Sequence, residues 1–370
     1  MRQSRAEIEL KSLRDNYEGI RKRVGDAVRI MGVVKANAYG HGIVEIARAL
    51  ESFGADYLGV GFLEEGVELR QNGIHVPILV LGGVMGSQIH EFLRHRLEFT
   101  IASLQIAQYV NEVASSIGRK APVHLKIDTG MERIGVRSPG APAFIEAVCR
   151  MKQLEVVGLY SHLATSGTRD RTFVLEQLER FHDVLRKVSS AGIEIPYVHI
   201  ANSGAILDLP ESHFTMVRPG LMLYGAYPTR ETSESIPLQP VMQLKSRIVY
   251  LKTVPAATSI SYGRQYFTRA ATSIATVPIG YGDGYSRRLS GQAEVLINGR
   301  RYPVAGTICM DQLMVDLGTG SGCRIGDDVT LLGRDGAEEI SAWELADRSG
   351  TIPYEIFTAV TARVPRVYVH

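Results

Sequence analysis

A lysine at the end of an apolar run is the first residue in this sequence that could do chemistry. Lys35 follows Ile30–Val34 and precedes the glycine-rich, aromatic segment "ANAYGHG". An amine in such a position can form a Schiff base with an aldehyde. Gly40 and Gly42 would allow the backbone to approach a ligand closely. A lysine at a strand end can also serve solubility alone, so the rest of the chain has to decide between these two interpretations.

Further reactive or polar groups follow the later apolar runs. They are Lys126, Asp128, Arg133, His162, Asn202, Ser203, Arg218 and Gly220. Ser203, the Gly220 N–H and Tyr39 can bind a phosphate through neutral donors. An aldehyde together with a phosphate describes pyridoxal 5′-phosphate. No cluster of Asp, Glu, His and Cys with metal-ligand spacing accompanies these groups, so we expect no catalytic metal.

The elements that must position these groups are short β-rich runs in the first 220 residues, with helical spacing between them. The segment Arg171–Val188, for example, places Val174, Leu178, Phe181 and Leu185 on one face. Near-continuous apolar runs are what a parallel sheet buried on both faces requires, so we predict a (β/α)₈ barrel of the TIM type. The eight runs are Val28–Val34, Asp56–Val60, Ile78–Leu81, Leu97–Ile101, Val123–Ile127, Val156–Tyr160, Tyr197–Ile200 and Thr215–Val217.

The second part of the chain has a different pattern. Residues 229–237 are polar and indicate a linker, and strands without intervening helices follow it. Asn298-Gly299 predicts a hairpin turn, and Ser341 with Glu344 predicts the capping box of a short helix. We therefore predict a barrel domain over residues 1–235 and a mainly antiparallel β domain over residues 236–370. The predicted strands are Gln243–Val254, Ser273–Pro278, Glu294–Ile297, Thr307–Asp316 and Val329–Leu332.

Composition narrows the class of protein. The 370 residues exceed the size at which one core usually stops growing, which favours two domains. A formal charge of +2, spread along the chain, argues against nucleic acid or a membrane surface as the main partner. The start lacks the apolar core of a signal peptide, and the three cysteines have no CxxC spacing. We expect a soluble protein of the cytoplasm.

Nine segments of the sequence resemble the motifs of the alanine racemase family, in that family's order and over essentially the whole chain. The segments are "VVKANAYGHG", "DTGMERIG", "YSHLATS", "IANSGA", "VRPGLMLYG", "ISYGRQY", "PIGYGDGY", "GTICMDQLMVD" and "YEIFTAVTARVPRVY". An ordered set of this kind is far more specific than any one of its members.

The resemblance implies a pyridoxal 5′-phosphate enzyme that acts as a homodimer, with the β domain of each subunit contributing to its partner's site. Lys35 would hold the cofactor, and Lys35 and Tyr262 would be the two catalytic bases. Arg133 and the backbone N–H of Met310 would bind the substrate carboxylate. The further cofactor contacts implied are Tyr39, Arg133, His162, Ser203, Arg218, Gly220 and Tyr354, with Lys126, Asn202, Tyr281 and Asp311 in support.

Two bases suit the chemistry of racemisation, because the α-proton leaves one face of the substrate and a proton returns to the other. Tyrosine has an unperturbed pKa near 10, so Tyr262 needs help to act as a base. Hydrogen bonds through His162 to the Arg218 cation could supply that help. Arg218 opposite the pyridine nitrogen disfavours its protonation, which limits carbanion delocalisation and suppresses side reactions.

Some local assignments stay open. Lys126 could pair with Asp128, whereas in the family the lysine at this position is often carbamylated and orients the arginine that we place at Arg133. Glu132 stands where the family more often has a small or amide residue. Gly282 replaces a more usual alanine.

The alternatives in function are a racemase of serine or of several amino acids, a basic-amino-acid decarboxylase of the same fold type, and a non-catalytic pyridoxal phosphate carrier. Decarboxylases of that type place an acidic residue at the pyridine nitrogen, which Arg218 contradicts. A lone-barrel carrier would not need residues 240–370. Tyr281 and Tyr354 would crowd the pocket and favour alanine, whose D-enantiomer is a precursor of cell-wall peptidoglycan.

Overall fold

The computed structural model describes residues 2–370, which divide into two compact units. The first, called the barrel unit below, comprises Arg14–Ala38 and Ile43–Leu238. The second, called the β unit, comprises the described residues up to Leu13, together with Tyr39–Gly42 and Gln239–His370. The chain therefore passes between the units after residues 13, 38, 42 and 238.

The barrel unit contains a closed circuit of parallel strands, each of which coincides with a run predicted from the sequence. Two sheets, β10-β2-β3-β4 and β5-β6-β8-β9, make up the circuit. A bridge between Leu79 and Glu98 joins β4 to β5, and the Thr215 N–H donates to the Val198 oxygen between β10 and β9. The predicted (β/α)₈ barrel is confirmed. Its strands are β2 (Arg29–Val33), β3 (Tyr57–Val60), β4 (Ile78–Val80), β5 (Phe99–Ile101), β6 (Ala121–Asp128), β8 (Leu154–Tyr160), β9 (Tyr197–His199) and β10 (Met216–Val217).

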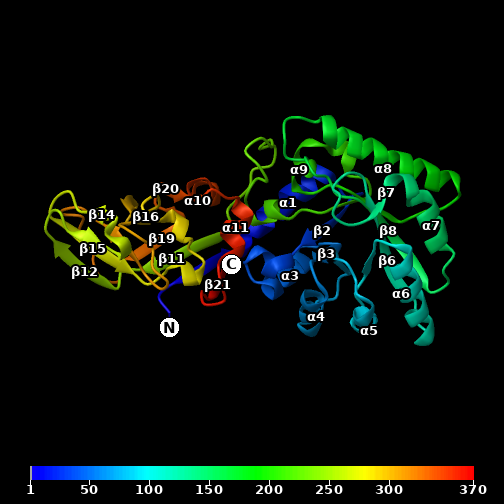
Figure 1. The fold of residues 1–370 in the computed structure, drawn as a ribbon, viewed down its shortest axis with the longest axis horizontal. Coiled ribbons are helices and arrows are strands. Elements are labelled where there is room, and N and C mark those ends of the chain that lie inside the picture. The colour runs from blue at the N-terminus through cyan, green and yellow to red at the C-terminus, as the bar shows by residue number, and fades with distance from the viewer. Residues whose placement is uncertain (1) are drawn as a thin grey trace. The chain divides into compact units, whose positions relative to one another are not determined.

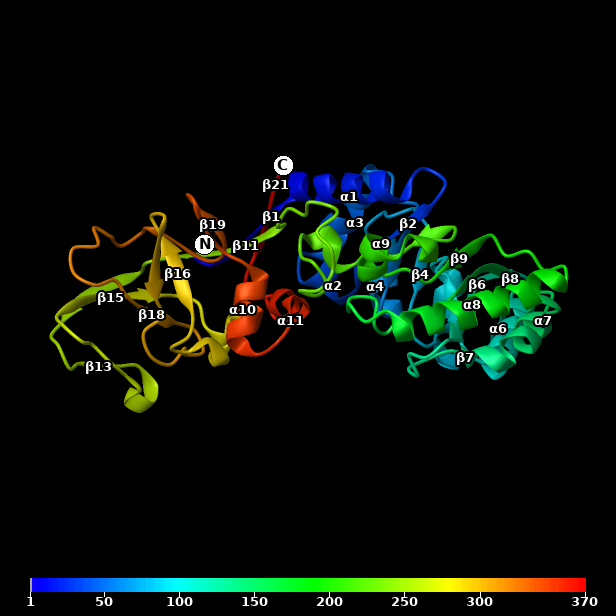
Figure 2. The ribbon, with the colours of Figure 1, turned by 90° about the horizontal axis from the view of Figure 1, so that it is seen from above.

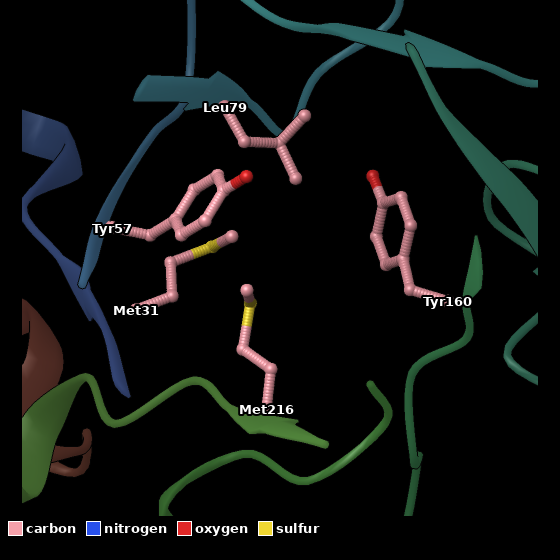
Figure 3. Packing of buried hydrophobic residues seen from close by; sticks show 5 residues of the cluster. All are labelled: Met31, Tyr57, Leu79, Tyr160 and Met216. Carbon is pink, nitrogen blue, oxygen red and sulfur yellow. The ribbon is translucent and has the colours of Figure 1, made fainter. Parts of the chain in front are cut away.

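Apolar side chains fill the barrel because its strands are covered on both faces, by helices outside and by one another inside. Figure 3 shows five buried side chains from different strands that point into the same interior space, Met31, Tyr57, Leu79, Tyr160 and Met216. Leu81 and Tyr197 pack against this cluster. The interior is therefore a packed core.

Helices surround these strands (Figure 1). The predicted helix over residues 171–188 is present as α8, which buries Val174, Leu178 and Phe181 but leaves Leu185 only partly buried. A short strand, β7 (Val136–Arg137), pairs with β6 outside the circuit. The longer helices are α1 (Leu10–Val24), α3 (Ile43–Ser52), α4 (Leu63–Gln71), α5 (Ile89–Arg94), α6 (Leu104–Ser116), α7 (Ala141–Cys149), α8 (Thr172–Ser190) and α9 (Ser203–Asp208).

The β unit is mainly antiparallel, as predicted. Its largest sheet has the order β17-β16-β19-β11-β1-β21, in which only β1 and β21 pair in parallel, and β20 adds to β19. A second sheet has the order β12-β15-β18, and β13 pairs with β14. The strands are β1 (Arg5–Glu9), β11 (Met242–Arg247), β12 (Tyr250–Val254), β13 (Ser259–Ile260), β14 (Tyr266–Phe267), β15 (Thr272–Val277), β16 (Glu294–Ile297), β17 (Arg300–Pro303), β18 (Leu313–Asp316), β19 (Asp328–Asp335), β20 (Glu338–Ile340) and β21 (Arg366–Val369).

Two of the predicted strands are wrong in extent. Gln243–Val254 is two strands in different sheets, because the Ile248 N–H bonds to Asp327 while the Val249 N–H bonds to Thr276. Within the predicted strand Thr307–Asp316, only Leu313–Asp316 is a strand. The preceding residues form a loop whose backbone groups bond to other loops rather than to a sheet.

The predicted turn and helix start are present in the β unit. Asn298 and Gly299 take positive φ values of 51° and 72° between β16 and β17, which is the conformation that an Asn-Gly hairpin turn requires. Ser341 accepts from the Glu344 N–H at the start of α10 (Ala342–Ser349), but the Glu344 carboxylate binds Arg301 instead of completing the capping box. Figure 2 shows α10 beside α11 (Pro353–Thr358). Within residues 2–370, no helix is long and apolar enough to cross a membrane.

Candidate functional site

Lys35 begins a left-handed turn, α2 (Lys35–Tyr39). Ala36, Asn37, Ala38 and Tyr39 have φ values between 51° and 55°. A left-handed helical conformation costs L-residues roughly 1–2 kcal/mol each. Such strain persists only where surrounding contacts determine the conformation, and it concentrates at functional sites.

Side chains of the barrel unit hold this turn at both ends. The Glu65 carboxylate accepts from the N–H groups of Ala36 at 2.6 Å and Gly61 at 2.7 Å. Asn37 Oδ1 accepts from the N–H of Ile43, the first residue of α3, at 2.8 Å. These bonds fix the direction in which the chain leaves Lys35.

Replacing Glu65 with alanine should lower the free energy of unfolding by about 1–3 kcal/mol, because the backbone N–H groups of Ala36, Gly61 and Phe62 lose a charged acceptor. Chemical denaturation followed by circular dichroism measures this. Glu64→Ala is the matched control, since Glu64 is exposed in the same helical turn and its carboxylate makes no hydrogen bond within residues 2–370. Equal losses in the two variants would show that Glu65 does not hold the turn.

The Lys35 amine makes no hydrogen bond or ion pair within the described residues 2–370. Burial lowers its pKa, as do the nearby Arg133 and Arg218 cations, while Glu65 acts in the opposite direction. The neutral amine is the form that attacks an aldehyde. A lowered pKa raises the share of this neutral form, and the role of Lys35 stays a prediction.

Arg218, just beyond β10, is a buried cation with no carboxylate in direct contact among residues 2–370. Its Nη1 donates to His199 Nδ1 at 2.8 Å, and its Nη2 donates to the Ser161 oxygen at 2.8 Å and the Ile200 oxygen at 3.2 Å. Burial lowers its pKa to about 10. Its Nε–H and its second Nη1–H find no acceptor within residues 2–370.

His162 lies beside this guanidinium. Arg218 Nη2 lies 3.2 Å from His162 Nδ1, and because Nη2 has only two N–H groups, one of them is shared between this nitrogen and a backbone oxygen. Burial and the neighbouring Arg218 and Lys126 charges lower the pKa of His162 well below its usual value. The imidazole is therefore neutral, and its remaining proton is on Nε2, where it can donate to another group. His162 and Arg218, two members of the predicted series of hydrogen bonds to Tyr262, therefore both lie in the barrel unit.

Lys126 is buried and makes no ion pair within residues 2–370. Its Nζ lies 4.2 Å from the centre of the Tyr160 ring. Asp128 does not pair with it, because the Asp128 carboxylate accepts from the N–H groups of Gly130 at 2.8 Å and Arg133 at 3.2 Å. Burial, followed by Arg218 and Arg133, lowers the pKa of Lys126 far below its usual value, against the effect of Asp128. An ammonium is disfavoured at this position.

The Arg133 guanidinium is exposed and makes no ion pair within residues 2–370. The preceding residue, Glu132, has a left-handed φ of 52° and pairs with the exposed Arg137 at 2.9 Å. Glu132 is a residue at which the sequence departs from the family pattern, and Arg137 balances the negative charge of its carboxylate. Arg133 therefore remains available to an anion.

Ser203 and Gly220 lie together in the barrel unit. Ser203 Oγ accepts from the Gly220 N–H at 2.9 Å, so this N–H bonds to the protein in the structure. The hydroxyl hydrogen of Ser203 has no acceptor within residues 2–370 and remains a donor. Asn202 supports this segment, because its Oδ1 accepts from the Ala205 N–H at 3.2 Å and from the Ser166 hydroxyl at 2.7 Å.

In the β unit, the rings of Tyr39 and Tyr354 are 5.9 Å apart. Burial raises the pKa of Tyr354 to about 12 and raises that of Tyr39 further. Both phenols therefore stay protonated at neutral pH.

The close approach of a ligand at Gly40 and Gly42 stays a prediction, but the structure gives a different reason for both glycines. A Cβ at Gly40 would lie 2.2 Å from the Phe357 oxygen, and one at Gly42 would meet the Tyr368 hydroxyl. Both glycines accommodate other segments of the β unit.

Three other predicted residues project from neighbouring loops of the β unit. Tyr262, Met310 and Tyr281 are 71%, 53% and 40% exposed. Ser261 and Arg264 have left-handed φ values of 67° and 49°, so the turn that carries Tyr262 is constrained.

The loops that carry Tyr281 and Met310 are bonded to each other. The N–H groups of Tyr281 and Gly282 donate to the oxygens of Cys309 at 3.0 Å and Met310 at 2.9 Å. The Met310 N–H has no acceptor within residues 2–370. It is therefore available to a carboxylate.

Arg363 anchors this pair of loops. It binds Asp311 at 2.5 Å and the buried Asp283 at 3.2 Å. A Cβ at Gly282 would lie 2.4 Å from Arg363 Nη1 and 3.0 Å from the Met310 oxygen, so a larger residue at this position would require the Arg363 side chain to move.

Sequence reasoning missed Glu65, Asp283, Arg363 and three polar residues inside the barrel, Glu98, His124 and His199. The imidazoles interrupt the apolar runs "VHLKI" and "YVHI", and Glu98 interrupts "LEFTI". A buried polar group needs a partner, so these interruptions were a usable signal.

Models of two protein domains match the chain. One, described as "Alanine racemase, N-terminal domain", matches residues 8–228. The other, described as "Alanine racemase, C-terminal domain", matches residues 241–368.

Individual relatives match over their full length. The chain is 44% identical to alanine racemase 2 of Caldanaerobacter subterraneus, covering 100% of this chain and 96% of the relative. It is also 44% identical to the alanine racemase of Carboxydothermus hydrogenoformans, covering 100% of each. Among solved structures, the alanine racemase of Clostridium difficile superposes with a TM-score of 0.95 at 39% identity, covering 100% of this chain and 96% of that one.

Proposed function

Because the chain belongs to the alanine racemase family and is an amino-acid racemase, we propose that it interconverts L-alanine and D-alanine with pyridoxal 5′-phosphate. The observation that carries the proposal is the pair formed by Lys35 and Arg218. Within the described part of the chain, Lys35 is an amine of lowered pKa without an ion pair, and Arg218 is a cation with two N–H donors that have no protein acceptor. Residues 1–235 would bind the cofactor, and residues 236–370 would contribute to the partner subunit's site.

The side chains present fit this cofactor. Pyridoxal 5′-phosphate, when bound, supplies an electron-withdrawing ring that acidifies the Cα–H bond of the amino acid it carries. Lys35 would hold its aldehyde carbon, and the hydroxyls of Ser203, Tyr39 and Tyr354 would donate to its phosphate. The free N–H groups of Arg218 suit an acceptor such as the ring nitrogen. Gly220 and Asn202 would keep the Ser203 hydroxyl in place.

Lys35 and Tyr262 of the partner subunit would move the protons. The Lys35 amine takes a proton from, or returns it to, one face of Cα, and the partner's Tyr262 phenol does the same at the opposite face. The Nε2–H of His162 is free to stabilise the phenolate, since its Nδ1 accepts from Arg218.

The substrate carboxylate would bind to the exposed Arg133 guanidinium and to the free N–H of Met310. Asp311 would hold the Met310 loop through Arg363. Tyr281 and Tyr354 would limit the substrate side chain to a small group. Racemisation of serine or of several amino acids is the second candidate, because a hydroxymethyl group adds only one heavy atom to the methyl of alanine.

Lys126 would be carbamylated. The buried amine lies in the field of Arg133 and Arg218, which disfavours an ammonium and favours the carbamate anion. The carbamate would orient Arg133.

Protein equilibrated with ¹³C-bicarbonate should therefore show one carbamate carbon signal by NMR that is absent from Lys126→Ala, because that variant has no amine to modify. The Lys126→Ala variant should bind the cofactor but show a raised KM for alanine. Lys120→Ala, which removes an exposed lysine, is the control and should keep the signal. A spectrum of wild-type protein without the signal would contradict carbamylation.

Assay of the purified, cofactor-loaded protein with L-alanine, L-serine and L-ornithine tests the function. We expect formation of D-alanine, a lower kcat/KM for serine and no release of CO₂ from ornithine. CO₂ release without racemisation would instead indicate the decarboxylase, and inactivity towards all three would favour the carrier.

We further propose that the protein is a homodimer of the cytoplasm that supplies D-alanine for peptidoglycan. A homodimer would cover the exposed side chains of Tyr262 and Met310. Neither nucleic acid nor a membrane is expected among its partners, given the small net charge of +2.

A further inference from the structure

A line of buried polar side chains crosses the interior of the barrel unit. Glu98 lies just before β5, His124 within β6, His199 at the end of β9 and Arg218 just after β10. His124 Nε2 is 2.8 Å from Glu98 Oε2, and His124 Nδ1 is 2.9 Å from His199 Nε2. His199 Nδ1 is 2.8 Å from Arg218 Nη1. Each member is less than 9% exposed.

We propose that Glu98 is the buried counter-ion of Arg218 and acts on it through two neutral imidazoles, each with its proton on Nε2. Glu98, His124 and His199 are then positioning residues for the guanidinium. The chain of hydrogen bonds is an inference from geometry alone, whereas its catalytic consequence rests on the role given to Arg218 under Proposed function.

The two ends fix the direction of every bond in the chain. A guanidinium can only donate, and an ionised carboxylate can only accept. His199 Nδ1 must therefore accept from Arg218, which leaves its Nε2–H to donate to His124 Nδ1. His124 then carries its proton on Nε2 and donates to Glu98.

Other protonation states leave a group without a suitable partner. If His124 were an imidazolium, its Nδ1–H would donate to His199 Nε2, and His199 would have to accept at both nitrogens as an imidazolate. Burial and the Arg218 charge also lower the pKa of His199 well below its usual value, which favours its neutral form. One cation and one anion, with two neutral rings between them, satisfy every contact.

The backbone leaves room for this chain. His124 is opposite Gly158 in the pairing of β6 with β8, and the register shifts between Val123 and His124. A Cβ at Gly158 would lie 2.0 Å from His124 Nδ1. Only glycine leaves space for the ring at the point where it bonds to His199.

Aromatic rings enclose the two imidazoles. Tyr160 stacks on His199 with ring centres 4.7 Å apart and an angle of 4° between the planes. Tyr57 lies edge-on to His124 at 6.0 Å. Figure 3 shows Tyr57 and Tyr160 on opposite sides of the apolar cluster. In this environment of low polarity, a distant carboxylate interacts with Arg218 more strongly than it would in water.

The first test measures the tautomers directly. Long-range ¹H–¹⁵N NMR correlations of the holoprotein labelled with ¹⁵N-histidine distinguish Nε2–H, Nδ1–H and doubly protonated rings. In Glu98→Gln, whose amide oxygen can still accept from His124, the two signals that shift are assigned to His124 and His199. The other eight of the ten histidines serve as internal controls.

We expect both assigned rings to be neutral with the proton on Nε2. An Nδ1–H tautomer or an imidazolium at either ring overturns the proposal. If Glu98→Gln does not fold, Gly158→Ala provides an independent assignment, because the added methyl group displaces the His124 ring and shifts its signal. The tautomers are then determined from the wild-type spectrum.

The second test measures the effect on the site. Glu98→Gln should lower kcat for racemisation roughly 10- to 100-fold, by analogy with the range found when hydrogen-bond partners of metal ligands are replaced. KM for alanine should stay within about twofold, since Glu98 does not contact the substrate-binding Arg133. Glu112→Gln, an exposed replacement of the same kind, is the control. An unchanged kcat would refute the positioning role. If both rings have the expected tautomers but the protein does not racemise alanine, only the proposed function is refuted.

Discussion

Replacing Lys35 with alanine should reduce kcat for alanine racemisation by on the order of 10³-fold or more, because the variant loses both a proton-transfer group and the amine that holds the cofactor. The wild-type holoprotein should be yellow. Borohydride treatment followed by peptide mapping should place the reduced cofactor on Lys35.

Lys126 is the second lysine to which the cofactor could be attached, so the peptide mapping has to distinguish it from Lys35. It is also buried, and its pKa is also lowered. The two amines differ in their surroundings, because Lys126 lies over the Tyr160 ring inside the barrel whereas Lys35 begins the strained turn that follows β2. Reduced cofactor on Lys126, or full activity of Lys35→Ala, would remove Lys35 from the mechanism.

Mixing inactive Lys35→Ala with inactive Tyr262→Ala should restore activity, because the first lesion lies in the barrel unit and the second in the β unit. In a homodimer with shared sites, a mixed dimer has one site with both lesions and one intact site. Random exchange of equal amounts makes about half of the dimers mixed, so recovery should approach about a quarter of the wild-type activity.

A mixture of Lys35→Ala with Arg133→Ala is the matched control. Both lesions lie in the barrel unit, so each site of a mixed dimer retains one of them and activity should not recover. Subunit exchange has to be shown separately with subunits of different mass. If exchange occurs and Lys35→Ala with Tyr262→Ala still remains inactive, Tyr262 serves its own chain or is not the second base.

Most of the barrel could be predicted from the sequence because each of its strands is buried on both faces and therefore appears as a local apolar run. Strand β1 carries no such signal. Its sequence, "RAEIE", buries only Ala6 and Ile8. Its partners β11 and β21 begin at Met242 and Arg366, so nothing near it in the sequence indicates the pairing.

The site could be predicted in part, for a similar reason. Lys35 and Arg218 follow apolar runs, and the ends of parallel barrel strands are where functional groups gather. His124 and His199 lie within the runs and were missed. The left-handed turn after Lys35 could not be foreseen, because Ala36–Tyr39 contains no glycine and its conformation depends on Glu65, from a later helix.

The position of β1 in its sheet has a consequence for how the chain folds during synthesis. Both neighbours of β1 lie more than 200 residues later in the sequence, so neither has been made when β1 leaves the ribosome. Strand β1 therefore acquires its hydrogen bonds only after β11 and β21 have been synthesised. Until then its backbone donors and acceptors are unpaired, like those at the exposed edge of a sheet.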